Sequence, residues 1–287
     1  PGMSLSSQLV YLNGEFMPLD QARIPVLDRG FLFGDGVYEV IPVYGGRPLR
    51  LAEHLRRLER SLSAIHMDSP LSDEAWSQII DRLIDGPEDQ QIYIQVTRGV
   101  QPKRDHAIPA TITPTVYAMG SRIAPIPTGG IKAVTVTDIR WDRCDIKAIT
   151  LLANVLLRQE AISRGAAEAV IVRDGLALEG AASNLFIVQK QTIITPPKSD
   201  TILPGITRDL VLEIAQAAGF ETVERTIALP ELRNADEIWF TSSTREILSV
   251  TELDGLPVSG GEPGPVWRSV LAAYQDYKCR LREGSSS

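Results

Sequence analysis

Lys147 is the residue of this chain best suited to covalent chemistry. It follows residues 143–146 (RCDI), and no charged residue comes after it until Arg158. An amine that is partly shielded from water is more often neutral, and a neutral amine attacks carbonyl groups to form Schiff bases. The alternative is a lysine that caps a strand, with its stem packed and its charged head in water.

Glu179 is the second candidate, because it lies in a turn of small and apolar residues, 178–186 (LEGAASNLF). A carboxylate in such surroundings can keep a nearby nitrogen protonated through its charge. The alternative is an exposed acid at the end of a strand. Further along, residues 203–208 (LPGITR) place a glycine directly before a predicted helix, whose first N–H groups and positive dipole end suit a phosphate.

The order and spacing of Lys147, the Glu179 turn and the 203–208 segment resemble those of the fold-type-IV pyridoxal-phosphate enzymes. This group includes D-amino acid, branched-chain and R-selective amine aminotransferases and aminodeoxychorismate lyase. The resemblance extends from about Tyr11 to the last helix and so covers nearly the whole chain. It implies an α+β fold with a smaller N-terminal α/β domain and a larger C-terminal domain that has a β-barrel-like core.

Residues 120–130 contain two prolines and three glycines, which predicts a linker between the two domains. We therefore expect an N-terminal domain over residues 1–119 and a C-terminal domain over residues 131–287. The second domain is expected to carry Lys147.

The resemblance assigns a cofactor, pyridoxal 5′-phosphate, and the residues that hold it. Lys147 would bind it as an internal aldimine and move a proton between the substrate Cα and the cofactor C4′, and Glu179 would face the ring nitrogen. The remaining predicted cofactor residues, most of them near the phosphate, are Arg57, Leu203, Ile206, Thr207, Ser243 and Thr244. On pattern alone, Arg57 could instead lie on a solvated helix face, and Ser243 and Thr244 could form an ordinary turn.

Tyr38 and an Arg-x-His segment indicate how the substrate carboxylate would be bound. D-amino acid aminotransferases pair a strand tyrosine in a Val-Tyr-Glu-Val context, present here at 37–40, with such a loop reaching over from the neighbouring subunit. This chain has Arg104 and His106 at that place, and arginine can bond both carboxylate oxygens at once. The alternative is an ordinary polar loop.

Two further comparisons bear on the branch of the family. Aminodeoxychorismate lyases carry a glycine-rich stretch where this chain has residues 100–103 (VQPK), so we favour the D-amino acid branch. Ala181 and Ala182 stand where D-specific relatives have serines. Hydroxyl assistance near the cofactor ring is therefore expected to be absent or to come from Ser183.

These features predict a ping-pong transamination between a D-amino acid such as D-alanine and 2-oxoglutarate or pyruvate. The alternatives are a branched-chain L-amino acid aminotransferase, a 4-amino-4-deoxychorismate lyase, an R-amine aminotransferase, and a non-catalytic member that keeps the fold as a binding or oligomerisation module. The resemblance also implies a homodimer.

Composition excludes several other classes of protein. The 287 residues are 44% apolar and 23% charged, as in a globular protein, and the net charge of −7 argues against a nucleic-acid partner. No run approaches ~20 apolar residues and no leader is apparent, so we expect no membrane span and a cytoplasmic location. The two cysteines are expected to be reduced, and the three histidines form no metal-ligand spacing with them, so no metal site is predicted.

Local patterns predict the elements that would position these residues. Asn13 and Gly14 predict a hairpin over residues 9–18, and glycines at 30, 34 and 36 are expected to break any helix before a strand at 37–44. Apolar spacings of three and four predict a helix over 51–65, and Ser72 predicts the start of another over 73–85. Further strands are predicted over residues 91–98, 115–119, 131–137, 169–172, 176–179 and 237–241. Three more helices are predicted: one that ends at residue 165, one over residues 206–219, and one that begins at residue 265. Residues 1–2 resemble a cloning remnant and 284–287 a loose tail.

Overall fold

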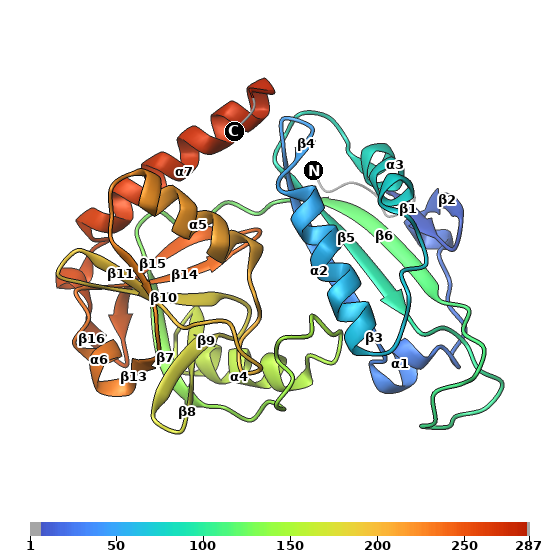
Figure 1. Ribbon diagram of the computed structural model, residues 1–287, viewed down its shortest axis with the longest axis horizontal. Helices are drawn as coiled ribbons and strands as arrows, with labels where there is room; N and C mark the ends of the chain where they lie inside the picture. Colours follow the sequence, from blue (N-terminus) through green and yellow to red (C-terminus); the bar gives the residue numbers. More distant parts are fainter. Residues whose placement is uncertain (1–6, 286–287) are drawn as a thin grey trace. The chain divides into compact units, whose positions relative to one another are not determined.

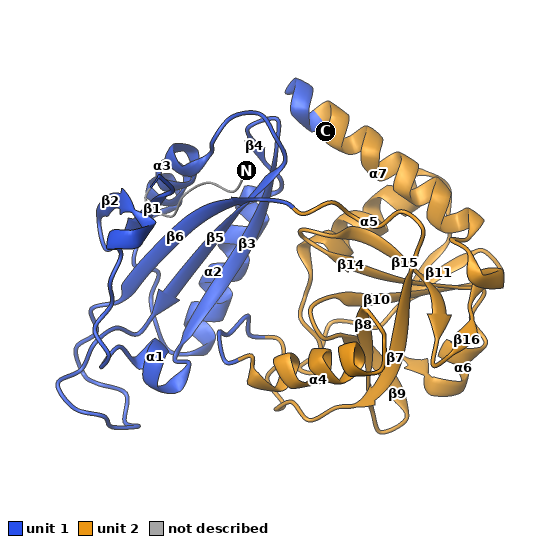
Figure 2. Cartoon of the chain, turned by 180° about the vertical axis from the view of Figure 1, so that it is seen from behind, with its two compact units in different colours: residues 1–123, 146–150, 281–285 blue, residues 124–145, 151–280, 286–287 orange. Residues whose placement is uncertain are grey.

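The computed structural model describes residues 7–285, and the chain divides into two compact units (Figure 1). The described residues of unit 1 are 7–123, 146–150 and 281–285, and those of unit 2 are 124–145 and 151–280 (Figure 2). The predicted cloning remnant at residues 1–2 and the last two residues of the predicted tail lie outside the described residues.

Unit 1 is built on a six-stranded antiparallel sheet with the order β2-β1-β6-β5-β3-β4. Its strands are β1 (Leu9–Leu12), β2 (Glu15–Pro18), β3 (Gly36–Tyr44), β4 (Arg47–Pro48), β5 (Gln90–Thr97) and β6 (Thr115–Arg122). Asn13 and Gly14 both have positive φ, 50° and 97°, in the turn between β1 and β2, which confirms the predicted hairpin.

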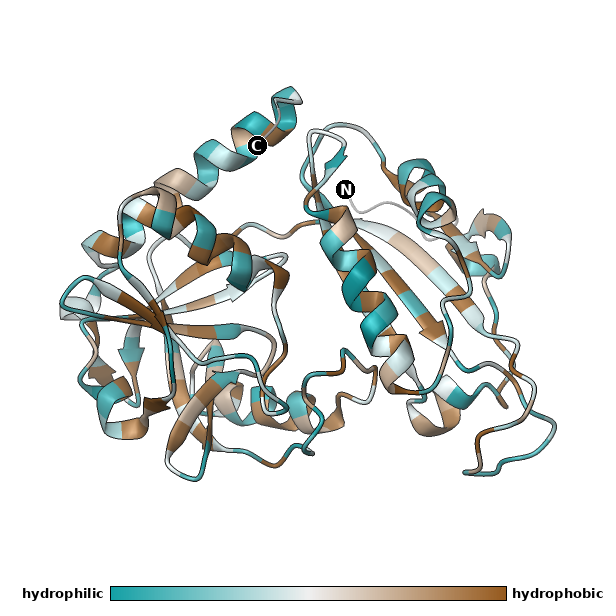
Figure 3. Ribbon diagram, viewed as in Figure 1, coloured by the Kyte–Doolittle hydropathy of each residue, from teal (hydrophilic) through white to brown (hydrophobic). Residues whose placement is uncertain are grey.

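Two helices of unit 1, α2 (Leu51–Ala64) and α3 (Asp73–Leu83), pack apolar residues in the core, and α2 buries the apolar stripe that the sequence predicts. The Ser72 hydroxyl accepts a hydrogen bond of 3.2 Å from the Ala75 N–H and so begins α3. The side of α2 turned toward the viewer in Figure 3 is mostly teal, as expected for the polar face of a helix that buries its other face. The short 3₁₀ helix η1 (Leu19–Gln21) follows β2.

The expectation that glycines break any helix before β3 was wrong. Helix α1 (Arg29–Phe33) begins where the Asp28 carboxylate accepts a 2.8 Å bond from the Gly30 N–H, and it ends at Gly34 with φ of 66°. A Cβ atom at Gly30 would lie 2.3 Å from Cγ2 of Thr97. The glycines therefore permit close packing and termination of a short helix.

Unit 2 contains a closed six-stranded barrel, which confirms the predicted barrel-like core. The ring closes because β9 pairs with β10 through Glu179 and Asn184, in addition to the path β10-β14-β15-β7-β8-β9. The barrel strands are β7 (Ile131–Thr137), β8 (Glu168–Arg173), β9 (Leu176–Gly180), β10 (Asn184–Gln189), β14 (Glu237–Ser242) and β15 (Glu246–Leu253). Shorter strands extend it at β11 (Thr192–Thr195), β12 (Thr222–Glu224), β13 (Ile227–Ala228) and β16 (Leu256–Pro257).

Helices cover parts of this barrel. Helix α4 (Leu152–Ser163) packs Leu157 and Ala161 against apolar residues of β7 and β8, and α5 (Ile206–Ala217) contacts β14. The remaining helices are α6 (Leu229–Arg233), the 3₁₀ helix η2 (Ser259–Gly261) and α7 (Pro265–Glu283). None of the helices in the described part of the chain combines the length and apolar character needed to cross a bilayer.

Two features of the division differ from the sequence expectation. Strand β6 continues to Arg122 because its last residues pair with Gln90 and Gln91 of β5, so the predicted linker 120–130 begins inside a strand. Segment 146–150, with Lys147, packs with unit 1 and not with the residues around it in sequence. The domain boundaries themselves remain a prediction.

The core of unit 1 yields a stability prediction. Ile41 of β3 is fully buried, so Ile41→Ala should leave a cavity and lower the free energy of unfolding by about 2–5 kcal/mol. Val26→Ala, at a side chain that is 71% exposed, should change it by less than about 0.5 kcal/mol. Urea unfolding of both variants measures the difference, and equal losses would contradict the packing described.

Candidate active site

Lys147 lies against β3 in unit 1. Its backbone N–H donates to the Ser61 hydroxyl at 3.2 Å, and its carbonyl accepts from the Tyr38 N–H at 3.0 Å. The Lys147 Nζ lies 4.2 Å from the centre of the Tyr38 ring, in cation–π contact. The structure therefore brings together the predicted Schiff-base lysine and the predicted substrate tyrosine.

Arg57 is buried, which excludes the solvated-face interpretation for this residue. Its Nε and Nη2 donate to both oxygens of the buried Glu39 at 2.8 and 2.7 Å, and His54 Nδ1 lies 2.7 Å from the same carboxylate. Burial opposes ionisation of Glu39, but the Arg57 charge and the hydrogen bonds lower its pKa to about 2. The Arg57 guanidinium is thereby fixed on α2, whereas neighbouring Arg56 is exposed.

Burial lowers the pKa of His54, despite its contact with Glu39. A neutral His54 therefore donates to a carboxylate whose charge Arg57 already balances. Glu39 lies on the same face of β3 as the apolar Val37 and Ile41. A charged residue on an apolar strand face needs a buried partner, and this pattern is the local signal of the ion pair.

Arg104 and His106 share a partner in unit 1, the ring of Phe33. The Arg104 guanidinium carbon lies 4.8 Å from the ring centre, and the His106 ring centre lies 5.1 Å from it. Both predicted carboxylate-binding side chains thus lie against helix α1. The sequence patterns did not predict this helix.

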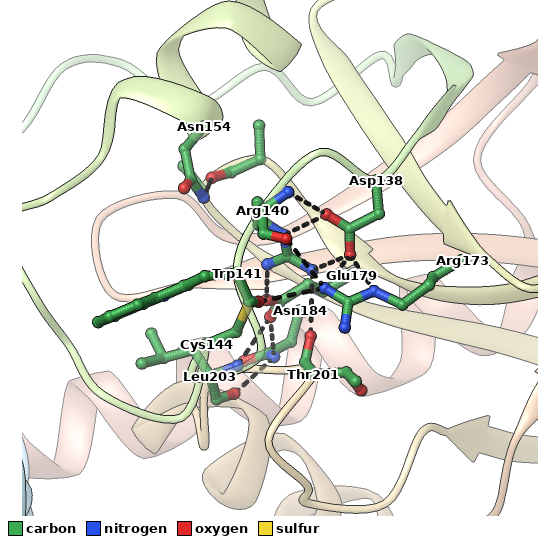
Figure 4. Close-up of polar contacts among 12 residues, drawn as sticks. Asp138, Arg140, Trp141, Cys144, Asn154, Arg173, Glu179, Asn184, Thr201 and Leu203 are labelled. Carbon is green, nitrogen blue, oxygen red and sulfur yellow. Dashed lines mark hydrogen bonds and ion pairs between the residues drawn. The ribbon is translucent and has the colours of Figure 1, made fainter. Parts of the chain in front are cut away.

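Glu179 is buried at the end of β9, so the exposed-acid interpretation is wrong (Figure 4). One carboxylate oxygen accepts from Arg140 Nη1 at 2.5 Å, and the other accepts from the Leu203 N–H at 3.1 Å and from Asn184 Nδ2 at 3.2 Å. Asn184 also donates to the Leu203 carbonyl at 2.9 Å. The structure brings Glu179 and Leu203, both predicted cofactor residues, into direct contact.

Charges behind Glu179 hold Arg140 in place. Arg140 donates from Nε and Nη2 to Asp138 at 3.0 and 3.1 Å, and Arg173 bonds the same carboxylate (Figure 4). Burial alone would lower the pKa of Arg140, but Asp138 and Glu179 raise it, so Arg140 stays charged. Sequence reasoning missed Arg140, because its partner Glu179 is distant in sequence and nothing local marks the pairing. It therefore also missed Asp138, which holds Arg140 in place.

Burial raises the pKa of Glu179 to about 7, even though the Arg140 charge and the hydrogen bonds from Arg140 and Leu203 favour its ionised form. A carboxyl group that titrates near neutrality responds strongly to any charge placed beside it. A protonated ring nitrogen near Glu179 would favour the carboxylate, and the carboxylate would in turn keep that nitrogen protonated.

The start of α5 suits a phosphate. Gly205 precedes the helix, and no side chain in the described part of the chain caps the first N–H groups of α5. A Cβ atom at residue 205 would lie 2.0 Å from Oδ1 of Asn184, so only glycine fits beside the residues that hold Glu179. Thr207 is buried in the first turn.

The turn between β14 and β15 adds hydroxyl groups to unit 2. It carries Ser243 and Thr244, both half-buried, directly after β14, which contacts α5. On β14 itself, the buried Thr241 Oγ1 has no hydrogen-bond partner among the described residues. Backbone donors, hydroxyls and the helix dipole together match the needs of a phosphate dianion.

Ser183 does not offer a free hydroxyl in the turn after Glu179. Its Oγ donates to Glu168 at 2.9 Å, and the same carboxylate accepts from the N–H groups of Ala181 and Ala182 at 3.1 and 3.4 Å. The Glu168 carboxylate therefore fixes this turn through two backbone N–H groups and the Ser183 hydroxyl.

A known protein family matches the part of the chain that carries most of these residues. The family described as amino-transferase class IV matches residues 36–253, which include the Tyr38 strand, Lys147, the Glu179 turn and the start of α5. The chain belongs to this family.

Class IV relatives cover almost the whole chain. The D-alanine aminotransferase of Bacillus licheniformis is 39% identical over 272 residues, which cover 93% of this chain and 96% of the relative. The D-alanine aminotransferase of Staphylococcus aureus strain MW2 is 38% identical over 274 residues, which cover 93% of this chain and 97% of the relative. Among solved structures, the branched-chain aminotransferase of Thermoproteus uzoniensis with norvaline has a TM-score of 0.88 at 28% identity and covers 98% of this chain and 96% of its own.

Membership of class IV confirms three predictions: the chain has the type IV fold, it is an aminotransferase, and its cofactor is pyridoxal phosphate. The D-alanine aminotransferase relatives also agree with the predicted D-amino acid branch. The roles of the individual site residues remain predictions. Unit 1 carries Lys147, Tyr38, Arg57, Arg104 and His106, and unit 2 carries Glu179, Leu203, Ile206, Thr207, Ser243 and Thr244.

The raised pKa of Glu179 predicts a pH dependence of stability. Because the folded state holds this proton more tightly than the unfolded chain, the contribution of Glu179 is present below about pH 4.5 and is lost as the pH rises to about 7. Between pH 4.5 and pH 8, wild-type apoprotein should lose about 3 kcal/mol more unfolding free energy than Glu179→Gln. Urea unfolding at both pH values tests this, and parallel losses would contradict it.

Proposed function

We propose that this enzyme transfers the amino group of a D-amino acid, such as D-alanine, to 2-oxoglutarate or pyruvate in a ping-pong exchange. The observation that carries the proposal is the buried Glu179, held by Arg140, Asn184 and Leu203 beside the uncapped start of α5. The D-alanine aminotransferase relatives, at 38–39% identity, favour the D-amino acid branch over the branched-chain alternative.

Pyridoxal phosphate, when bound, draws electrons from the substrate Cα into its ring. Lys147 would hold the cofactor covalently and then move the proton at the substrate Cα. Glu179 would orient the ring and keep its nitrogen protonated, with Arg140 preventing Glu179 from turning away. Leu203 would line the ring site, since its backbone is fixed to Glu179 and Asn184.

The phosphate would be bound by the N–H groups of Ile206 and Thr207 and by the hydroxyls of Ser243 and Thr244. The resemblance to the fold-type-IV enzymes assigns Arg57 a phosphate-binding role as well. The pairing of Arg57 with Glu39 keeps its planar group oriented before any ligand binds.

The substrate carboxylate would be bound by Arg104 and His106, together with Tyr38. Arginine offers two parallel donors that match the two oxygens of a carboxylate. The loop of Arg104 would serve the site of the neighbouring subunit, as the resemblance to D-amino acid aminotransferases implies.

We further propose a homodimer in the cytoplasm. Helix α4 exposes Leu152, Val155 and Leu156, which are 70%, 59% and 52% accessible, and a second copy could cover this apolar face. Cys144 and Cys279 are both free, which fits a reducing compartment.

A substrate panel tests the proposed reaction. Purified enzyme should convert D-alanine with 2-oxoglutarate to pyruvate and D-glutamate, and should be at least about tenfold slower with L-leucine. Chiral chromatography of the glutamate product gives the stereochemistry. Turnover confined to L-leucine, with L-glutamate formed, would refute the D-amino acid assignment.

Replacement of Lys147 tests the predicted covalent attachment. The wild-type protein should be yellow, whereas Lys147→Ala should lose the visible absorption band of bound cofactor and about 10³-fold or more of its turnover. Lys132→Ala is a matched control, since Lys132 is exposed in β7 and pairs with Glu252. A Lys147→Ala protein that remains yellow and active would show that another residue holds the cofactor.

A further inference from the structure

We propose that Arg29 is a positioning residue that fixes the loop carrying Arg104 and His106, so that this loop is ready to bind the substrate carboxylate. The proposal rests on the proposed function for the role of the loop, but the structural part concerns contacts within unit 1 alone. Its basis is the short helix α1, which the sequence patterns did not predict.

Helix α1 is firmly attached to the sheet at its first turn. Asp28 is fully buried, and its carboxylate accepts from the Thr97 hydroxyl at 2.7 Å and from the Thr115 hydroxyl at 2.6 Å, in addition to the Gly30 N–H. The Arg29 N–H donates to the Gly99 carbonyl at 2.9 Å. The helix is therefore tied to β5, to β6 and to the start of the loop that joins them.

The Arg29 side chain reaches three consecutive carbonyl groups of that loop. Nη1 donates to the carbonyls of Asp105 at 2.5 Å and Ala107 at 3.2 Å, and Nη2 donates to that of His106 at 3.3 Å. Arg29 is only 5% exposed, so a buried charged donor holds the backbone of an exposed loop. The planar guanidinium can span several acceptors in a way that a lysine ammonium cannot.

Asp35 fixes the orientation of Arg29. It accepts from Arg29 Nε at 2.8 Å and from Arg98 at 2.7 and 3.0 Å. Burial opposes its ionisation, but hydrogen bonds from Arg98 and Arg29 lower the pKa of Asp35, so it remains a carboxylate.

Phe33, in the same helix, supports the side chains of the loop. Its ring centre lies 5.0 Å from the Arg29 guanidinium carbon and contacts both Arg104 and His106. Arg29 thus fixes the backbone of residues 105–107 while Phe33 supports the two side chains expected to bind the carboxylate. Without Arg29, three carbonyls lose their donor and the loop should become mobile.

The test combines kinetics with hydrogen–deuterium exchange. Arg29→Met should raise the KM for D-alanine by about tenfold or more while changing kcat and cofactor absorption little. In a double variant with Arg104→Met, the rise in KM should be smaller than the product of the two single effects, because Arg29 acts through the loop that carries Arg104. Arg29→Lys keeps the charge and the fold but cannot span three carbonyls, so its KM should also rise.

Hydrogen–deuterium exchange of the backbone amides in residues 99–112 should be about tenfold faster in both Arg29 variants than in the wild type. The control variant Arg56→Met removes an exposed charge from α2 and should leave this exchange rate unchanged. Unchanged loop exchange, or a KM penalty that multiplies with that of Arg104→Met, would overturn the positioning role. If the wild-type enzyme fails to use D-alanine, the proposed function is refuted instead. The KM comparison then uses the amino acid that the enzyme accepts, and the exchange result still decides the role of Arg29.

Discussion

The pairing of β9 with β10 is the constraint on which the rest of unit 2 depends. It closes the barrel through Glu179 and Asn184, and it thereby buries a carboxylate that needs partners. Asn184, Leu203 and Arg140 supply them, and the Asn184 side chain in turn requires a glycine at 205. One strand pairing thus positions the acid and the start of α5 together, which are the ring and phosphate ends of the proposed cofactor site.

Unit 1 follows the same physical rule with different residues. Two of its carboxylates are paired with cations, Glu39 with Arg57 and Asp35 with Arg29 and Arg98. The buried Asp28 instead accepts hydrogen bonds from two threonine hydroxyls and a backbone N–H. Truncating one member of such a pair is costly because the other charge is left buried without a partner. The cation proposed for the phosphate and the loop proposed for the carboxylate are consequently held rigidly before ligand binding, which reduces the entropy lost on binding.

Periodic patterns predicted the regular elements well, because burial of one face imposes a repeat that the sequence displays directly. The α2 stripe and the Asn13–Gly14 turn are examples. Helix α1 was missed because its glycines were interpreted as breakers, whereas Gly30 is required by contact with Thr97 and Gly34 ends the helix. Long-range pairs such as Arg140 with Glu179 leave no local trace, so motif resemblance found the acid but not the arginine that holds it.

A crystal structure of the yellow holoenzyme with D-alanine or a non-reactive analogue tests the central claim most directly. We predict continuous density between Lys147 Nζ and the cofactor, with a Glu179 oxygen within about 3 Å of the ring nitrogen and the phosphate at the first turn of α5. Density joined to a different lysine, or a ring nitrogen facing away from Glu179, would contradict the assignment of these residues.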